Sequence, residues 1–223
     1  EAGQRFPDAI RKFFYQTALQ FHLSGLNLPD GFLNGLSEYV LATRSHVATL
    51  NYDNLLYQPL IERQVLRGYD GALVDGFHND GFKVEHLERK FGRTFGYYLH
   101  LHGSPLFVNR GESVLKLKQA ELDIEADTIS SHIVLTHVDH KLAVISASEL
   151  LIAYWQRLLF SLSESEEIIL FGYSGGDEHL NSLLKSSAPD KSVRVVEWDG
   201  IGSHGERMAF WTGALSREVS LVR

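Results

Sequence analysis

The sequence contains no cysteine among its 223 residues. Disulfide bonds, a thiolate nucleophile and a zinc site with cysteine ligands are therefore all excluded. A chain without disulfides is compatible with the reducing cytoplasm, which is the location that we expect. Hydrophobic residues make up 44% of the chain, enough for residues 1–223 to form a single α/β domain with its own core.

Positive charge and long apolar runs are also scarce. Lys and Arg total 21 against 28 for Asp and Glu, which gives a formal net charge of -7. Proteins that bind the phosphate backbone of nucleic acids usually carry a basic surface, so we expect no direct nucleic-acid partner.

The apolar stretch Leu150–Leu162 contains Gln156 and Arg157 and is too short to cross a bilayer. With no signal peptide or anchor recognisable, we expect no membrane association.

Apolar periodicity predicts short strands that alternate with helices. Strands are expected at His46–Leu50, Tyr97–Leu101, Ile133–Leu135, Ile168–Phe171 and Val193–Trp198. Helices are expected at Ala9–Leu23 with Asp8 as N-cap, Leu36–Leu41, Asp53–Leu66, Ser148–Leu162 with Ile152 and Leu159 on its buried face, and Asp177–Leu184. This alternation predicts an α/β fold with a Rossmann-like, mainly parallel sheet and helices on both faces.

Two segments carry neither pattern. The glycine-rich stretch Gly68–Gly81 is expected to be a loop. Residues 109–128 are highly charged and have no strong strand pattern, so we expect a surface excursion or a small inserted lobe there.

Three segments share one layout, in which an apolar strand runs into polar or glycine residues. They are Thr49-Leu50-Asn51-Tyr52-Asp53, Leu101-His102-Gly103-Ser104 and Phe171-Gly172-Tyr173-Ser174-Gly175-Gly176-Asp177. In a parallel sheet such strand ends converge on one crevice, where ligands bind. The sequence therefore predicts that a carboxamide, an imidazole and a set of backbone N–H groups come together.

In this order, the Asn-Tyr-Asp, His-Gly and Gly-Tyr-Ser-x-x-Asp segments resemble those of sirtuin-like domains of a divergent bacterial type. The resemblance spans about Val47 to Trp198. It implies that NAD, or a related adenine dinucleotide, is bound and cleaved as a substrate. It also implies a homo-oligomer or a larger multidomain assembly, and in this family such domains often act as effectors of bacterial antiphage defence.

The resemblance gives Asn51 and His102 the catalytic roles. The carboxamide of Asn51 would hold the nicotinamide-side ribose or the attacking water, and would thus also bind the cofactor. The imidazole of His102 would act as a general base on a ribose hydroxyl or on water. Each residue also has a structural interpretation, as an Asn in a strand-to-helix turn and as a His packed near a strand end. His100, two positions earlier on the same strand, is an alternative to His102.

Cofactor-binding roles follow for several further residues. Gly103 would let the backbone approach the ligand, and Gly172, Ser174 and Gly175 would form an N–H cradle for phosphate or ribose; an ordinary turn explains this loop equally well. Asp53 belongs to the motif, although helix capping also explains it, as it does Asp177. Glu197 and Asp199 end the last strand, where this fold often places a group against the adenosine ribose; the sequence does not show which of them points inward, and Glu197 is the candidate that we carry.

Other features separate this chain from protein-deacetylating sirtuins. Those enzymes usually carry a four-cysteine zinc ribbon, so a zinc-free branch is implied. Leu50 stands where they have Gln, and Gly172-Tyr173-Ser174 replaces Gly-Thr-Ser, which counts against deacylation. His132, His137, His140 and Asp139 lie on no obvious common rigid element, so we predict no metal site.

Four functions remain open at this point. Hydrolysis of NAD to nicotinamide and ADP-ribose leads, followed by a module that senses NAD or ADP-ribose without turnover. NAD-dependent deacylation and a partner-docking domain are the others. The family's first strand and Gly-Ala-Gly loop are not recognisable in Glu1 to Asp8. Whether the protein lacks this segment, or whether it precedes Glu1, stays open.

Overall fold

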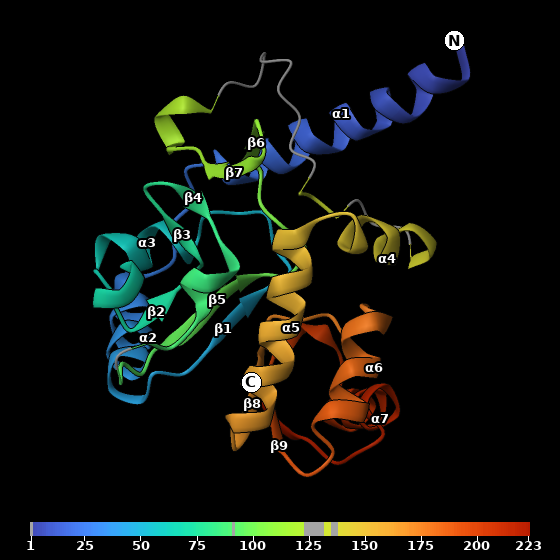
Figure 1. The fold of residues 1–223 in the computed structure, drawn as a ribbon. Helices are drawn as coiled ribbons and strands as arrows, with labels where there is room; N and C mark the ends of the chain where they lie inside the picture. The colour runs from blue at the N-terminus through green and yellow to red at the C-terminus, as the bar shows by residue number, and fades with distance from the viewer. Residues whose placement is uncertain (1, 91, 123–131, 135–137) are drawn as a thin grey trace. The chain divides into compact units, whose positions relative to one another are not determined.

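A computed structural model describes residues 2–90, 92–122, 132–134 and 138–223. The chain divides into two compact units, of which the first ends at Leu158 and the second begins at Leu159. Both combine helices with parallel strands (Figure 1). This is the α/β, Rossmann-like class that the sequence predicts.

The first unit contains most of the helices and strands. Its elements are α1 (Ala2–His22), α2 (Asp30–Thr43), β1 (Val47–Thr49), α3 (Tyr57–Glu62), β2 (Leu73–Val74), β3 (Phe77–His78), β4 (Gly81–Phe82), β5 (Gly96–His100), β6 (Phe107–Arg110), β7 (Ser113–Lys116) and α4 (Val138–Ser146). Short 3-10 turns lie at η1 (Gly68–Asp70), η2 (Val84–Leu87) and η3 (Gln119–Glu121). Helix α5 (Glu149–Glu164) contains the boundary between the units.

A parallel sheet in the order β1-β5-β2 forms the centre of the first unit. All five residues of β5 are buried, as expected for a middle strand that is covered on both faces. β1 pairs with β5 in the register Val47↔Tyr98, Ala48↔Leu99 and Thr49↔His100. This pairing places the carboxyl ends of β1 and β5 side by side (Figure 1).

Aromatic side chains join the covering helices to this sheet. On α5, the indole N–H of Trp155 donates to the carbonyl of Leu101 over 3.0 Å, and the hydroxyl of Tyr154 donates to the carbonyl of Asp75 over 2.8 Å. On α1, Tyr15 and Leu19 are buried in one cluster with Ile133, against which Tyr52 also packs. Because each bond satisfies a carbonyl near a strand end, the helices hold the sheet's carboxyl edge in place.

The second unit is smaller and has its own parallel sheet, in the order β10-β9-β8. Its elements are β8 (Glu167–Phe171), α6 (Glu178–Ser187), β9 (Ser192–Val196), the 3-10 turn η4 (Asp199–Ile201), α7 (His204–Leu215) and β10 (Ser220–Val222). Leu170, Val193 and Val195 are buried, whereas Ile169, Phe171 and Arg194 are exposed. This alternation shows a sheet with one buried face and one exposed face within the described structure.

Several predicted boundaries are wrong, because tertiary contacts override local signals. Helix α1 begins at Ala2, so Asp8 lies inside it and is not its N-cap. The helix expected at Asp53–Leu66 shrinks to α3, since the Asp53 side chain accepts from the Leu55 N–H at 3.0 Å and holds a turn instead.

Two segments expected to lack strands contain them. Gly68–Gly81 includes β2, which pairs with β5 in the central sheet, and β3, which pairs with β4. The predicted excursion begins inside β6, which forms an antiparallel hairpin with β7 around the positive-φ residue Gly111. Residues 123–128 of the excursion lie outside the described structure. Strands of two to four residues are too short to produce a clear alternating pattern.

Smaller corrections concern buried positions. Ile133 makes one isolated bridge with Gly103 rather than a strand, and Leu135 lies outside the described residues. On α5, Ile152 and Leu159 are exposed, so the buried face of this helix is narrower than predicted.

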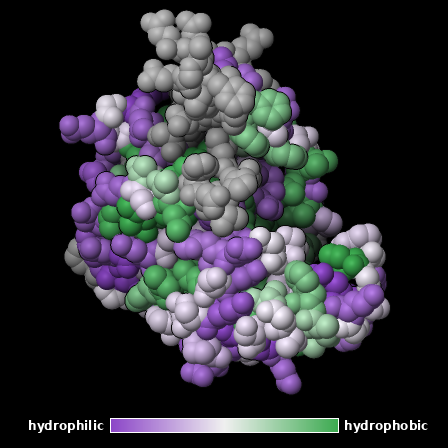
Figure 2. Space-filling model, turned by 90° about the vertical axis from the view of Figure 1, so that its right-hand side faces the viewer, coloured by the Kyte–Doolittle hydropathy of each residue, from purple (hydrophilic) through white to green (hydrophobic). Residues whose placement is uncertain are grey.

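On the face drawn in Figure 2, hydrophobic side chains lie in small groups among hydrophilic ones. None of the described helices is long and apolar enough to cross a membrane.

Candidate functional site

Asn51 and His102 follow two neighbouring parallel strands at the same level. The last register pair of β1 and β5 is Thr49↔His100, so each of the two residues lies two positions beyond it. The N–H of Leu101 donates to the carbonyl of Thr49 over 2.9 Å, which extends the pairing by one step. Asn51 is exposed and His102 is half-buried. Both side chains are therefore at the carboxyl edge of the sheet, outside its dry core.

Tyr52 connects the two segments and was missed by the sequence reasoning. Its ring lies 6.4 Å from the ring of His102, measured between centroids, and its hydroxyl donates to the carbonyl of Val134. Burial raises the pKa of Tyr52 to about 12, so its hydroxyl stays protonated at neutral pH and remains a donor. The middle residue of the Asn-Tyr-Asp motif thus packs the loop after β1 against His102.

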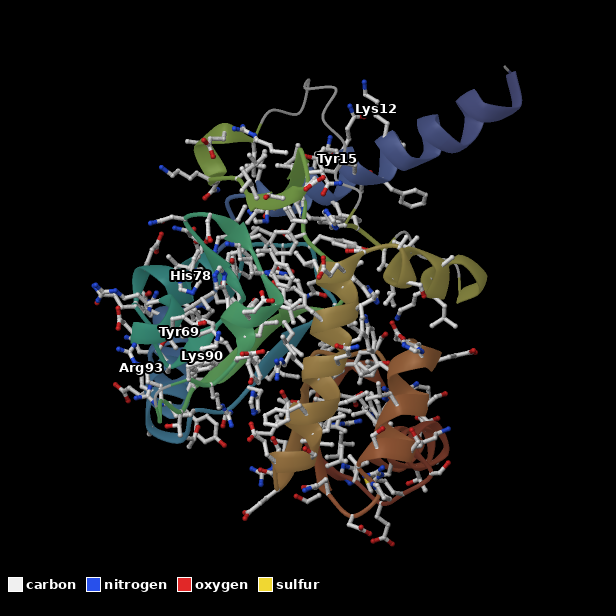
Figure 3. All side chains as sticks on the ribbon, viewed as in Figure 1. Lys12, Tyr15, Tyr69, His78, Lys90 and Arg93 are labelled. Carbon is white, nitrogen blue, oxygen red and sulfur yellow. The ribbon has the colours of Figure 1, made fainter. Side chains whose placement is uncertain are left out.

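Helix α1 contacts both the segment that carries Asn51 and the segment that carries His102. The Nδ1 atom of His22 lies 3.3 Å from the carbonyl oxygen of Tyr52, and the hydroxyl of Tyr15 (Figure 3) donates to the carbonyl of Pro105 over 3.4 Å. Burial lowers the pKa of His22, although the Tyr52 carbonyl and Asp53 partly oppose this effect. Two residues of one helix therefore contact the loops after β1 and after β5.

Backbone packing requires a glycine at position 103, whereas from the sequence we expected this glycine to let the backbone approach a ligand. Its φ is +77°, and an added Cβ would lie 1.5 Å from the carbonyl oxygen of His132. The N–H of Val134 also donates to the carbonyl of His102 over 2.9 Å. The backbone of His132 therefore fills the space that a Cβ at position 103 would need, and this contact fixes the chain that carries His102. The predicted role of Gly103 in cofactor binding stays a prediction.

An ion pair with a buried carboxylate lies in the first unit, at the turn before β3. Lys116 Nζ lies 2.8 Å from the Asp75 carboxylate and 2.7 Å from the Tyr57 hydroxyl, which itself donates to Asp75. Burial would raise the pKa of Asp75, but Lys116 and the hydrogen bonds from Tyr57 and the Phe77 N–H together lower it. The network joins α3, β7 and the turn before β3.

His100, the alternative to His102, is packed in a different environment. It is 1% exposed, and neither ring nitrogen has a hydrogen-bond partner among the described residues. The rings of Tyr57, Tyr98 and Phe107 surround it. Burial lowers the pKa of His100 to about 3, so it stays neutral at physiological pH. Of the two histidines, only His102 reaches the solvent-accessible edge.

The glycine-rich loop after β8 belongs to the second unit. Gly172 and Gly175 have φ of +61° and +78°, and the Ser174 hydroxyl accepts from the Gly176 N–H over 3.3 Å. An added Cβ at Gly175 would lie 2.7 Å from the ring of Phe210, so helix packing also requires this glycine. Asp177 is the N-cap of α6, as predicted, and accepts from the Leu180 N–H.

Glu197 is held inside the second unit rather than presented at its edge. Its carboxylate receives the Arg207 Nε–H at 3.1 Å and the Trp211 indole N–H at 2.8 Å. Hydrogen bonds from Arg207 lower the pKa of Glu197. These contacts explain the buried carboxylate structurally, so its predicted contact with a ribose stays a prediction.

The histidine-rich segment shows no metal-like arrangement where it is described. His132 Nδ1 lies 2.8 Å from the Ser148 hydroxyl and His132 Nε2 lies 2.8 Å from the Asn109 side-chain oxygen. His137 and the side chains of Asp139 and His140 lie outside the described residues. Across the described residues there is no group of three or more His, Asp or Glu side chains arranged to hold a metal ion.

A further polar cluster in the first unit is also accounted for by internal contacts. Figure 3 shows Tyr69, His78 and Arg93 close together. The rings of Tyr69 and His78 are 4.9 Å apart, and Arg93 Nη1 donates to the Tyr69 carbonyl and to Asp70. These contacts stabilise η1 against β3.

Comparison with known proteins gives a family match that covers both strand ends. A family model described as a SIR2-like domain matches residues 45–194, more than half of the chain. The matched range includes Asn51, His102 and the loop after β8. Comparison with curated proteins finds no match.

Proposed function

The chain belongs to the SIR2-like domain family, whose domains bind NAD, and from this we propose that it hydrolyses NAD to nicotinamide and ADP-ribose. One observation carries the proposal. Asn51 and His102 each lie two residues beyond the register pair Thr49↔His100, so a carboxamide and an imidazole follow adjacent strand ends. A ligand at that edge would meet both side chains.

In this mechanism the bond between ribose C1′ and the nicotinamide nitrogen breaks, and nicotinamide leaves with the bonding electron pair. The ribose then carries oxocarbenium character, which polar groups around it stabilise. His102 accepts a proton from the attacking water or from a ribose hydroxyl. Asn51 can donate to one oxygen and accept from another at the same time, so it orients the ribose or the water. Water supplies the oxygen that is added to C1′.

Nicotinamide release from NAD by the full chain tests the proposal. We expect His102→Ala to lower the rate by about 10²–10⁴-fold, the usual contribution of a general base. Asn51→Ala should cost about 10²–10³-fold, as for a polar group that stabilises a transition state. Asn34→Ala and His204→Ala, both at exposed positions, are the matched controls and should leave the rate unchanged.

A module that binds NAD or ADP-ribose without turnover is the alternative, because an exposed carboxamide can hold a ribose without reaction. Calorimetry separates the two functions. Binding of NAD with no nicotinamide released would establish sensing and contradict hydrolysis. Release that requires an acylated lysine peptide would instead indicate deacylation.

The biological setting is part of the proposal and rests on the family resemblance. As an effector of bacterial antiphage defence, the protein would act in the cytoplasm as a homo-oligomer or within a larger assembly. Infected cells that express it should then lose NAD, whereas cells that express His102→Ala should keep it. NAD levels that fall equally in both would rule out this role for the site.

A further inference from the structure

An exposed tryptophan follows β9 in the second unit. Trp198 is 72% exposed, whereas Trp155 and Trp211 are 6% and 0% exposed. A single exposed aromatic side chain is common on protein surfaces. How Trp198 is held, and where it lies in the sheet, therefore decide whether it has a role.

The indole of Trp198 packs against the backbone of Gly200. A Cβ added to Gly200 would lie 1.9 Å from Cζ3 and 2.1 Å from Cη2 of Trp198. The six-membered part of the indole thus lies against the Gly200 α-carbon, where only a hydrogen atom fits. A ring already held in this way loses little conformational freedom when a flat ligand settles on it.

Trp198 also takes the outward position at the end of β9. Val193, Val195 and Glu197 are buried, while Arg194 and Trp198 are exposed, so the in-and-out alternation of the strand continues past its end. Glu197 faces inward and binds Arg207 and Trp211. At this strand end Trp198 therefore faces outward, whereas Glu197 faces inward.

The glycine-rich loop begins beside the same strand end. The N–H of Gly172 donates to the carbonyl of Val196 over 3.1 Å, two residues before Trp198. In parallel α/β sheets, ligands bind beyond the carboxyl ends of the strands. The loop after β8 and the indole of Trp198 thus lie at the ligand-binding edge of the second unit's sheet.

We propose that Trp198 is a stacking platform for the adenine ring of an adenine nucleotide. The inference rests on the proposed function, which makes an adenine dinucleotide the substrate. Every base has a π-face that can stack on an aromatic side chain, and adenine offers a large, uncharged one. Asp199 is exposed next to Trp198; its carboxylate can accept from the exocyclic amine of adenine and would repel a phosphate. Trp198 lies outside the matched range 45–194.

Titration of the full chain with AMP, followed by tryptophan fluorescence and calorimetry, tests this proposal. AMP should quench the wild-type emission, since Trp198 is the exposed tryptophan. Trp198→Ala should weaken AMP binding about 5- to 100-fold, the range expected for one stacked base. Trp198→Phe should keep most of the affinity but lose the quenching. Tyr39→Ala removes another exposed aromatic, 49% exposed on α2, and should change neither.

The outcomes separate this inference from the proposed function. Unchanged AMP affinity in Trp198→Ala, or no AMP binding to the wild type, would overturn the role of Trp198, whether or not NAD is cleaved. Conversely, AMP binding that depends on Trp198 without any nicotinamide release would support the platform and reject hydrolysis. If Trp198→Ala instead lowers the molar mass measured by light scattering at unchanged AMP affinity, the side chain belongs to a protein interface and the proposal is wrong.

Discussion

The position of the His100 side chain is fixed by packing against aromatic rings and not by hydrogen bonds. It stands two residues before His102 in the same strand, yet three aromatic rings enclose it and its ring nitrogens have no partner among the described residues. The apolar pattern of the strand could not separate the two histidines, because each directly follows a leucine. The hairpin β6–β7, which supplies Phe107 and has no clear sequence signal, completes the enclosure of His100.

His100→Phe should therefore stabilise the protein. Removing two buried, unpaired nitrogens while keeping a ring should raise the free energy of unfolding by about 1–3 kcal/mol. The folded pKa of His100 is about 3, below its unfolded value, so the unfolded state binds the extra proton as the pH falls below about 6.5. The advantage of the variant should thus grow by about 1.4 kcal/mol per pH unit between about pH 6 and pH 4.

Urea denaturation at several pH values measures this effect. His204→Phe, at an exposed position on α7, should show no such pH-dependent gain. If the difference in free energy of unfolding between His100→Phe and the wild type stays constant with pH, His100 is not buried as a neutral ring.

The ion pair between Lys116 and Asp75 gives a second residue-scale prediction. Lys116→Met leaves the 4% exposed Asp75 carboxylate without its countercharge. This should lower the free energy of unfolding by about 3–5 kcal/mol, measured by denaturant titration. Arg63→Met breaks the pair with Asp30, whose side chain is 87% exposed, and should cost at most about 1 kcal/mol. Equal losses in the two variants would contradict a buried role for Asp75.

At the scale of elements, the strands that carry the site could be predicted from the sequence. The elements that pack around these strands could not. β1, β5 and β8 lie where the apolar runs indicate, because each run is bounded by a clear polar or glycine signal. The two-residue strands β2, β3 and β4 arise only from pairing with distant segments. Likewise, nothing local in α1 indicates that His22 contacts the Tyr52 carbonyl.

Gly103 tests the contact between the loop after β5 and residues 132–134. Gly103→Ala should destabilise the protein by well over the ~1–2 kcal/mol cost of a left-handed backbone, because its Cβ would meet the His132 carbonyl at 1.5 Å. Amide hydrogen exchange at Val134, whose N–H bonds to His102, should also accelerate.

Gly111→Ala is the matched control for this substitution. Gly111 has a φ of +62° and nothing within 4 Å of an added Cβ, so its variant should show only the backbone cost. If both alanine variants lose the same stability, the close approach of His132 to Gly103 does not exist in solution.

For the whole molecule, composition makes a prediction that the family alone does not. A chain without cysteine cannot build the four-cysteine zinc ribbon of protein-deacetylating sirtuins. We therefore expect the melting temperature and the rate of nicotinamide release to be unchanged by EDTA or by a reducing agent. A fall in either on chelation, reversed by adding zinc, would show that oxygen or nitrogen ligands hold a metal.

The fold class followed from the alternation of strands and helices, and the family from the order of three short motifs. The family match over residues 45–194 agrees with the second inference. What the sequence could not supply was the direction of individual side chains near strand ends. Glu197 and Trp198 are neighbours, and only the buried contacts of Arg207 and Trp211 reveal that Glu197 faces inward.

A double-mutant cycle on nicotinamide release most directly tests whether Asn51 and His102 act on one bound ribose. Rates for Asn51→Ala, His102→Ala and the double variant give the coupling between the two side chains. Residues that act together should be non-additive, so the double variant should be little slower than the slower single variant. Losses that simply multiply, or single variants as fast as the wild type, would contradict a shared site at the ends of β1 and β5.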